Sequence, residues 1–261
     1  MTTISGQSWF DGRECAVSLT FDDGMPSQLR RAVPYMNRLG LRGTLYLNPR
    51  ETSYREELVR WREVLAAGHE IGNHTTRHPC TGAIWDDGYP EALEKWTLAE
   101  IEADILLAEQ RLYEILPGLG PHTFCYPCYN HHVGSGTARQ SYTHIVAKHF
   151  VAGRGGAPNR GACINPSACD LSYLEASPAE LMRGYEMIGL VERAAARGRW
   201  VIFVFHGVGE GWLPVTEPDF QELCDHLHRH RGRLWTAPVA EVARHIAARR
   251  GMKLPEMRPP A

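Results

Sequence analysis

Short apolar runs alternate along the chain with longer segments in which apolar residues recur every three or four positions. The short runs predict buried strands, and the helical spacing predicts helices with one apolar face. The predicted strands are residues 15–21, 43–47, 69–72, 200–205 and 234–236, with a further short segment at 123–126. The predicted helices are residues 27–39, 56–67, 97–116, 141–150, 178–197, 220–230 and 239–249, and a glycine-rich stretch covers 153–161.

Residues 97–116 carry the clearest helical pattern, and Pro117-Gly118 ends it. Strands that alternate with helices imply a largely parallel sheet, because parallel neighbours need a crossover connection. We therefore expect an α/β fold, either an open doubly wound sheet or an incomplete (β/α) barrel. No linker divides the chain, so residues 1–261 are expected to form a single domain, with its core at about 12–245. Residues 250–261 are expected to form a tail that is frayed over 255–261.

The composition is that of an ordinary globular protein with a substantial core. The 261 residues are 43% hydrophobic and 22% charged, and the net charge is −2. Both signs of charge are spread along the chain, which excludes a basic nucleic-acid-binding tail and a polybasic membrane patch. No apolar run approaches the roughly 18 to 20 residues that cross a bilayer. Neither nucleic acid nor a membrane is expected as a partner.

The start of the chain and its cysteines bear on the compartment. Residues 1–10 lack the basic and apolar regions of a secretory signal. The seven cysteines are an odd number, scattered at positions 15, 80, 125, 128, 163, 169 and 224. Small secreted domains carry dense, even disulfide frameworks instead. These features predict mostly reduced thiols and a cytoplasmic protein.

Three polar clusters follow apolar strands, where the catalytic groups of α/β folds concentrate. They are Thr20-Phe21-Asp22-Asp23-Gly24, His74-Thr75-Thr76-Arg77-His78 and Phe205-His206-Gly207. Each has an ordinary alternative: an Asp-Gly turn, surface or core histidines, and a structural histidine. Taken together, two histidines and an aspartate form a ligand set that suits zinc and leaves one position for water.

In this order and spacing, the three clusters resemble the motifs of the polysaccharide deacetylase family, carbohydrate esterases that share the nodulation-deacetylase homology domain. Residues 20–24 match the family's Thr-Phe-Asp-Asp-Gly signature, and residues 74–78 match its His-(Ser/Thr)-x-x-His signature. The frequent lead-in Ala-Gly-His-Glu-Ile-Gly precedes the latter at 67–72, and residues 205–207 match the late histidine motif. The resemblance covers about residues 12–245.

The resemblance implies a distorted (β/α) barrel with seven or fewer parallel strands, and roles for five residues. Asp23, His74 and His78 would bind a metal ion, Asp22 would be the general base, and His206 would be the general acid. Zinc is the default ion, although iron, cobalt, nickel or manganese suit the same ligands. Zinc polarises a carbonyl and lowers the pKa of a bound water to about 7, so the implied roles are chemically coherent.

The third motif departs from the family's common Phe-Arg-Pro-Pro-Tyr-Gly. Residues 124–129 read Phe-Cys-Tyr-Pro-Cys-Tyr, which is closer to a subfamily that also lacks the arginine. Arg154 is expected to take that arginine's place beside Asp22, the alternative being a surface charge in a loop. Asp170 is expected to orient His206, the alternative being an aspartate that caps a turn.

Tyr126, Cys128 and Trp212 are the expected substrate-binding residues. Cys128 would offer its backbone N–H to the developing oxyanion. Trp212 follows His206 in a glycine-rich loop and would stack on a sugar ring, with core packing as the alternative. Cys125-x-x-Cys128 is expected to supply pocket-wall thiols, rather than a redox pair or part of a zinc site. Histidines 131 and 132 are expected at the rim of the site, and histidines 226, 228 and 230 on a surface face.

The sequence thus predicts a metal-dependent hydrolase that removes acetyl groups from an N- or O-acetylated sugar or glycoconjugate. One alternative is a hydrolase of a related small amide or imide, since the fold also hosts allantoinase-like activities. The other is a non-catalytic carbohydrate- or metal-binding descendant. The intact Asp22, Asp23, His74, His78 and His206 argue against the latter.

Overall fold

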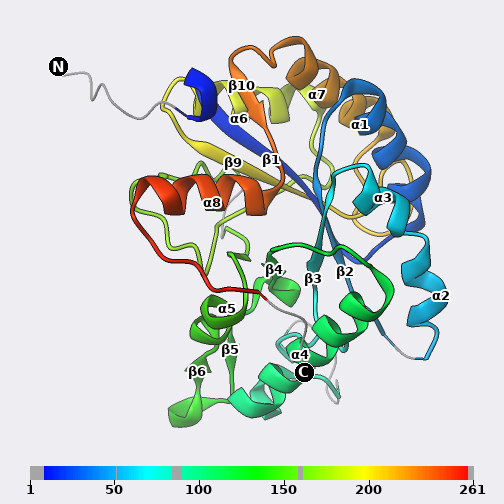
Figure 1. Cartoon of the computed structure of the whole chain (residues 1–261), viewed down its shortest axis with the longest axis vertical. Coiled ribbons are helices and arrows are strands. Elements are labelled where there is room, and N and C mark those ends of the chain that lie inside the picture. Colours follow the sequence, from blue (N-terminus) through cyan, green and yellow to red (C-terminus); the bar gives the residue numbers. More distant parts are fainter. Residues whose placement is uncertain (1–8, 51, 84–89, 158–160, 258–261) are drawn as a thin grey trace.

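The computed structural model describes residues 9–50, 52–83, 90–157 and 161–257. Parallel strands form one curled sheet with helices around it (Figure 1). The strands of this sheet are β1 (Cys15–Phe21), β2 (Thr44–Leu47), β3 (Glu70–Asn73), β4 (Phe124–Cys125), β7 (Gly153–Arg154), β8 (Ser177–Pro178), β9 (Trp200–Phe205) and β10 (Leu234–Thr236). β5 (His132–Val133) and β6 (Gln140–Ser141) form a separate antiparallel hairpin. The α-helices are α1 (Val33–Leu39), α2 (Tyr54–Val59), α3 (Arg62–Ala66), α4 (Leu98–Ile115), α5 (Thr143–His149), α6 (Gly184–Ala195), α7 (Glu217–Arg229) and α8 (Val239–Arg249).

Seven strands follow one another in the order β7-β4-β3-β2-β1-β9-β8, and every pair is parallel. β10 is a branch that pairs with residues 15–17 of β1, whereas β2 pairs with Thr20 and Phe21 of the same strand. The long β1 therefore holds two neighbours on one side. This open, curled sheet confirms the expected α/β fold, a distorted (β/α) barrel.

The buried strands determine where charged side chains can emerge. Val17, Leu19 and Phe21 enter a core together with α1, α6 and α7, while Ala16 enters a second core together with α8. Every residue of β1 and β9 is buried. The residues that follow these two strands are Asp22 and His206, so polar chemistry begins where the strands end.

Two predicted helices are interrupted, whereas the clearest one is confirmed. α4 matches residues 97–116, with Thr97 and Glu100 forming a capping box. The segment 27–39 opens with a π turn, Gln28–Ala32, before α1. The segment 56–67 divides into α2 and α3 around Trp61, which is buried and packs near Gly24. The break depends on packing of the Trp61 indole in the tertiary structure, which the spacing of apolar residues does not predict.

The helix predicted at 178–197 is wrong over its first six residues. Ser177 and Pro178 form β8, which pairs with β9 at Phe203 and Val204. α6 begins only at Gly184, after Leu181 has adopted a φ of 60°. Pairing with a buried strand therefore overrides the helical pattern at the start of this segment.

The tail is packed rather than frayed over residues 255–257, so this part of the expectation is wrong. Leu254 and Met257 are partly buried against the core, and the Met257 sulfur accepts a hydrogen bond from the His122 backbone N–H at 3.3 Å. Residues 258–261 and residues 1–8, part of the segment searched for a secretory signal, lie outside the described residues. In the described part of the chain, none of the helices is long and apolar enough to cross a membrane.

Cys80 and Cys128 form a disulfide, with Cα atoms 5.7 Å apart. This corrects the expectation that Cys128 is a pocket-wall thiol; the remaining five cysteines are free. β3 and β4 are neighbours through Asn73 and Phe124, so the segments that follow them meet although 48 residues separate the two cysteines. The bond therefore follows from strand order, which cysteine spacing does not reveal.

Candidate active site

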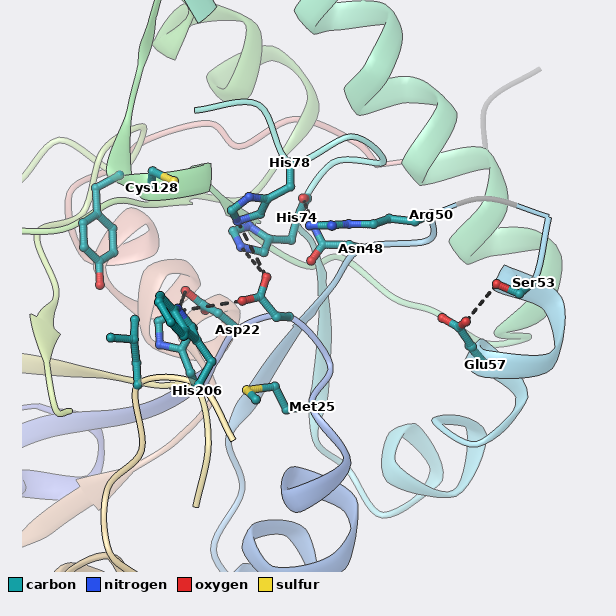
Figure 2. A pocket seen from close by; sticks show the side chains of 14 residues that line it. Asp22, Met25, Asn48, Arg50, Ser53, Glu57, His74, His78, Cys128 and His206 are labelled. Atoms are coloured by element: carbon teal, nitrogen blue, oxygen red, sulfur yellow. Dashed lines mark hydrogen bonds and ion pairs between the residues drawn. The ribbon is translucent and has the colours of Figure 1, made fainter. Parts of the chain in front are cut away.

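The carboxyl ends of β1, β3 and β9 open into one pocket of about 720 Å³ (Figure 2). All three polar clusters of the sequence meet there, through Asp22, Asp23, His74, His78 and His206. Two left-handed residues after β1 direct the aspartates: Asp23 has a φ of 67° and Gly24 a φ of 60°. A Cβ at Gly24 would also lie 3.1 Å from Leu47, so glycine suits this tight turn.

Asp23, His74 and His78 bring three potential ligand atoms to one place. Asp23 Oδ1 lies 3.7 Å from His74 Nε2 and 3.6 Å from His78 Nε2, and the three ligand atoms lie within 4.8 Å of one another. Within the described residues, Asp23 Oδ1 is buried without a hydrogen-bond partner. His74 Nδ1 donates to the Cys125 carbonyl oxygen at 2.9 Å, which leaves the Nε2 lone pair for a ligand. A buried acceptor facing two imidazole nitrogens fits a divalent cation such as zinc.

Buried acids on α4 hold the loop that carries both histidines. Asp104 accepts hydrogen bonds from the backbone N–H groups of Thr76 and Arg77, at 3.2 and 3.3 Å, and from the Thr76 hydroxyl. Glu109 accepts a hydrogen bond at 2.8 Å from the side chain of Asn73, the residue before the first histidine. Sequence reasoning missed these acids. Their one signal is that they share the helix face formed by the apolar residues.

The structure places Arg154 beside Asp22. Arg154 Nη2 lies 2.5 Å from both carboxylate oxygens of Asp22 and 2.5 Å from the sulfur of Cys125. Arg154 is fully buried, and the register of β4 and β7 pairs it with Cys125. Cys125 stands where the common family motif has its arginine. The Arg154 guanidinium therefore reaches Asp22 from β7, the strand that pairs with the third motif in β4.

The charges of these groups follow from their surroundings. Burial on its own would raise the pKa of Asp22, but Arg154, which contributes most, together with His74 and His206 outweighs this and lowers the pKa below its usual 3.8. Asp22 is therefore ionised at neutral pH. Burial lowers the pKa of His74 and that of His78 below 6.5. In the metal-free protein, both imidazoles are neutral at pH 7, which is the form that ligates a metal.

His206 faces the two aspartates, but Asp170 does not orient it. His206 Nε2 lies 3.9 Å from Asp22 Oδ2 and 3.9 Å from Asp23 Oδ2. Its Nδ1 is buried with no hydrogen-bond partner in the described part of the chain. Asp170 is exposed, and its carboxylate accepts hydrogen bonds from the backbone N–H and hydroxyl of Ser172, both at 2.8 Å. The turn-capping alternative is therefore correct for Asp170.

Gln28, which sequence reasoning missed, links the segments that follow β1 and β9. Its side-chain amide donates to the carbonyl oxygen of Asp22 at 2.6 Å and to that of His206 at 3.1 Å. Gln28 is fully buried in the π turn before α1. A single polar residue at the start of a helix gives no signal of this contact.

A family model for polysaccharide deacetylases matches residues 11–143. The chain belongs to this family. The fold is similar to that of a Mycobacterium smegmatis protein described as a polysaccharide deacetylase, with 15% identity, a TM-score of 0.64, and 100% of this chain and 99% of that chain covered. It is also similar to a family 4 acetyl xylan esterase from Clostridium thermocellum in complex with a cobalt ion, with 15% identity, a TM-score of 0.57, and 91% and 93% covered. At these identities the likeness shows the fold.

A gellan lyase from Bacillus sp. is 28% identical to this chain over 159 residues. The match covers 60% of this chain but 5% of the lyase. The chain thus spans a small part of that relative's length.

In this member of the polysaccharide deacetylase family, two of the three expected substrate-binding residues line the pocket. Cys128 lines it within its disulfide, and Trp212 lines it with 63% of its surface exposed. Tyr126 does not line it. Tyr126 is fully buried against aromatic rings, and its hydroxyl donates to the Ser172 carbonyl oxygen at 2.7 Å. Side chains alternate along an extended segment, so Cys125 faces Asp22 while the next residue points away.

Sequence reasoning also missed two pocket residues that follow β2 and the last residue of the third motif. Asn48 and Arg50 lie beside the two histidines (Figure 2), and the Asn48 side chain donates to the His74 carbonyl oxygen. Tyr129 lines the pocket in place of Tyr126. Asn48 and Arg50 belong to a segment without a distinctive pattern, so only the strand order brings them to the site.

The other histidines occupy different places. His131 and His132 line a second pocket of about 370 Å³ that shares Tyr129 with the first. His226 and His228 do not form a solvated face. They are partly buried, and they contact the Glu192 carboxylate and the Leu39 carbonyl oxygen, both at 2.8 Å. These contacts join helices, which indicates a structural role.

Proposed function

We propose that the protein is a metal-dependent hydrolase that removes acetyl groups from an N- or O-acetylated carbohydrate. One observation carries the proposal: the unpartnered Asp23 Oδ1 faces Nε2 of both His74 and His78, next to an ionised Asp22. Membership of the polysaccharide deacetylase family supports this reaction class. One fold relative, an acetyl xylan esterase in complex with a cobalt ion, is consistent with a divalent cation.

Asp23, His74 and His78 would hold the cation, with zinc as the preferred ion for this ligand set. When bound, the ion supplies a Lewis acid that activates water and polarises the acetyl carbonyl. Oxygen and nitrogen ligands also suit other divalent transition metals. The family resemblance and the geometry of the pocket both support the choice of these three residues as ligands.

Asp22 would accept the proton of the attacking water. The carboxylate is ionised because Arg154 holds its pKa down, and Arg154 also fixes its orientation from the buried side. A base must be both unprotonated and positioned before the reaction. The buried ion pair provides both conditions.

His206 would donate a proton to the departing amine or alkoxide, after which acetate leaves. Its Nε2 faces the pocket at the same 3.9 Å from each aspartate. The backbone N–H of Cys128 is the proposed donor to the developing oxyanion, a role that does not depend on the side chain. Trp212, exposed at the rim, would pack against a sugar ring.

Acetate release from acetylated sugars, chito-oligomers and acetylxylan tests the proposal. The protein is assayed after chelation, after zinc is restored, and as Asp22→Asn, with the exposed Asp170→Asn as the matched control. We expect release that requires metal, survives in Asp170→Asn and falls by about 10²- to 10⁴-fold in Asp22→Asn, the usual contribution of a general base. Equal release from wild type and Asp22→Asn, or none from the zinc-loaded wild type, would overturn the proposal.

A further inference from the structure

The Cys80–Cys128 disulfide lies against the far side of a proposed metal ligand. His78 presents Nε2 toward Asp23 Oδ1, at 3.6 Å, and its Nδ1 lies 3.7 Å from the sulfur of Cys80. Cys80 is fully buried, whereas Cys128 lines the pocket. The His78 imidazole therefore has Asp23 on one side and the two disulfide sulfur atoms on the other.

Potential ligand atoms of His78, Cys80 and Cys128 lie within 4.8 Å of one another. Zinc binds thiolate sulfur at about 2.3 Å and imidazole nitrogen at about 2.0 Å, so its ligands stand about 3.5 to 3.8 Å apart in a tetrahedron. The contact between His78 and Cys80 already has this spacing. The two sulfurs would need only to move from bonding distance to that separation.

We propose that reduction of the Cys80–Cys128 disulfide creates a second zinc site, formed by His78, Cys80 and Cys128, that competes with the catalytic site for His78. The proposal of competition rests on the proposed function of Asp23, His74 and His78. Sulfur ligands favour zinc over the harder divalent ions. The new site would offer two thiolates and one imidazole as ligands. The fourth coordination position of the zinc would be open to the pocket, because Cys128 lines it.

The reaction balances with a dithiol as reductant. The dithiol transfers two electrons and two protons to the disulfide, which yields two cysteine thiols and a cyclic disulfide. Zinc binding then releases one proton from each thiol. A neutral imidazole has a single lone pair, so His78 moves its proton from Nδ1 to Nε2 when it changes sites. The catalytic site loses one of three protein ligands in that step.

The consequence is a hydrolase whose metal site depends on the thiol redox state around it. A compartment that keeps thiols reduced favours the sulfur site, whereas an oxidising one keeps the disulfide and leaves His78 for catalysis. The pocket-facing Cys128 gives a small dithiol access to the bond. Cys125 is fully buried beside Asp22 and Arg154 and is not one of the three residues of this group.

Cobalt(II) spectroscopy tests the site directly. Chelator-treated protein receives one equivalent of Co²⁺, before and after dithiothreitol treatment and its removal without air. We expect an intense near-ultraviolet sulfur-to-cobalt band only after reduction. The band should persist in Cys163→Ser, which changes a free cysteine outside the cluster, and should be lost in Cys80→Ser/Cys128→Ser.

Acetate release is measured on the same samples. We expect reduction to lower it at least tenfold at one equivalent of metal and re-oxidation to restore it, with no effect of reductant on the double variant. Absence of the band from reduced wild type, or its presence in the reduced double variant, would overturn the site. A band without any loss of activity would overturn the competition for His78. No acetate release from oxidised, metal-loaded protein would refute the proposed function, while the band still decides the sulfur site independently.

Discussion

The two sides of the pocket differ in how completely their polar atoms are paired. On one side, Asp22 is held by the buried Arg154, which the edge strand β7 supplies at 2.5 Å. On the other, His206 has a buried Nδ1 without a hydrogen-bond partner in the described residues, and Trp212 and Leu213 near it are exposed. The first side belongs to the sheet, and the second to a loop that follows it.

This difference indicates which of the proposed catalytic side chains is held in position before a substrate binds. Sheet register holds Asp22 and Arg154 in place, because strand positions cannot shift without breaking backbone hydrogen bonds. The loop after β9 is closed by few such bonds, among them Gly207 N–H to the Trp212 carbonyl oxygen at 3.0 Å. We therefore expect substitutions on the Asp22 side to affect folding and activity together, and substitutions on the His206 side to affect activity alone.

The largest expected effect is that of Arg154→Met. Removing one partner of a buried ion pair leaves the other charge uncompensated, which costs about 3–5 kcal/mol. We expect the free energy of unfolding to fall by about that amount, and acetate release to fall with it. Denaturant titration measures the first, and Arg60→Met, at an exposed arginine outside the pocket, is the control. If Arg154→Met left the free energy of unfolding unchanged, the Asp22 side of the pocket would not differ in stability from the His206 side.

His206→Gln is expected to lower kcat by about 10²-fold or more, through loss of a general acid. The midpoint of thermal unfolding and the zinc content should stay at wild-type levels, because His206 is partly exposed and is not among the proposed ligands. Asp170→Asn should leave kcat unchanged, since its exposed carboxylate accepts hydrogen bonds from Ser172 in its own turn. Equal losses in the two variants would restore Asp170 to the site.

Acidification is expected to destabilise the metal-free protein, starting at about pH 6.5. His74 and His78 have pKa values below 6.5 because burial penalises their charged forms. Between these values and 6.5, the unfolded chain binds more protons than the folded protein, so stability is complete above 6.5 and declines as pH falls. Asp22 adds to the decline only below its usual 3.8.

Denaturant titrations of chelator-treated protein at successively lower pH measure this dependence. The variant His78→Gln removes one of the two groups and should flatten the curve. A metal-free stability that does not change between neutral pH and the acid range would contradict the burial of these imidazoles.

The smallest expected effect is that of Trp212→Ala. A ring contact of this kind contributes about 0.5–1.5 kcal/mol, so KM for a sugar substrate should rise by about two- to tenfold while kcat and stability stay unchanged. Steady-state kinetics separates these parameters. A loss of stability would mean that the indole packs in the core, although 63% of it is exposed.

Much of the fold was predictable from local patterns. β1 and β9 are mostly apolar and buried at every position because both faces of the sheet are covered, and α4 has both a regular apolar spacing and a capping box. Predictions failed where a distant contact competes with the local pattern. Residues 177–178 joined a strand, and Met257 packed against the core beside His122.

The sequence by itself determined which polar groups form the candidate site, because each of the three motifs is contiguous in the chain and lies at or directly after the end of an apolar strand. It also indicated Arg154 as the partner of Asp22, from the absence of an arginine in the third motif. Only the tertiary structure decided that these two residues, 132 positions apart, are in contact. It likewise decided that Cys80 pairs with Cys128, and that Tyr126 turns away from the pocket. These outcomes depend on strand order, register and side-chain alternation, and they arise when the sheet assembles.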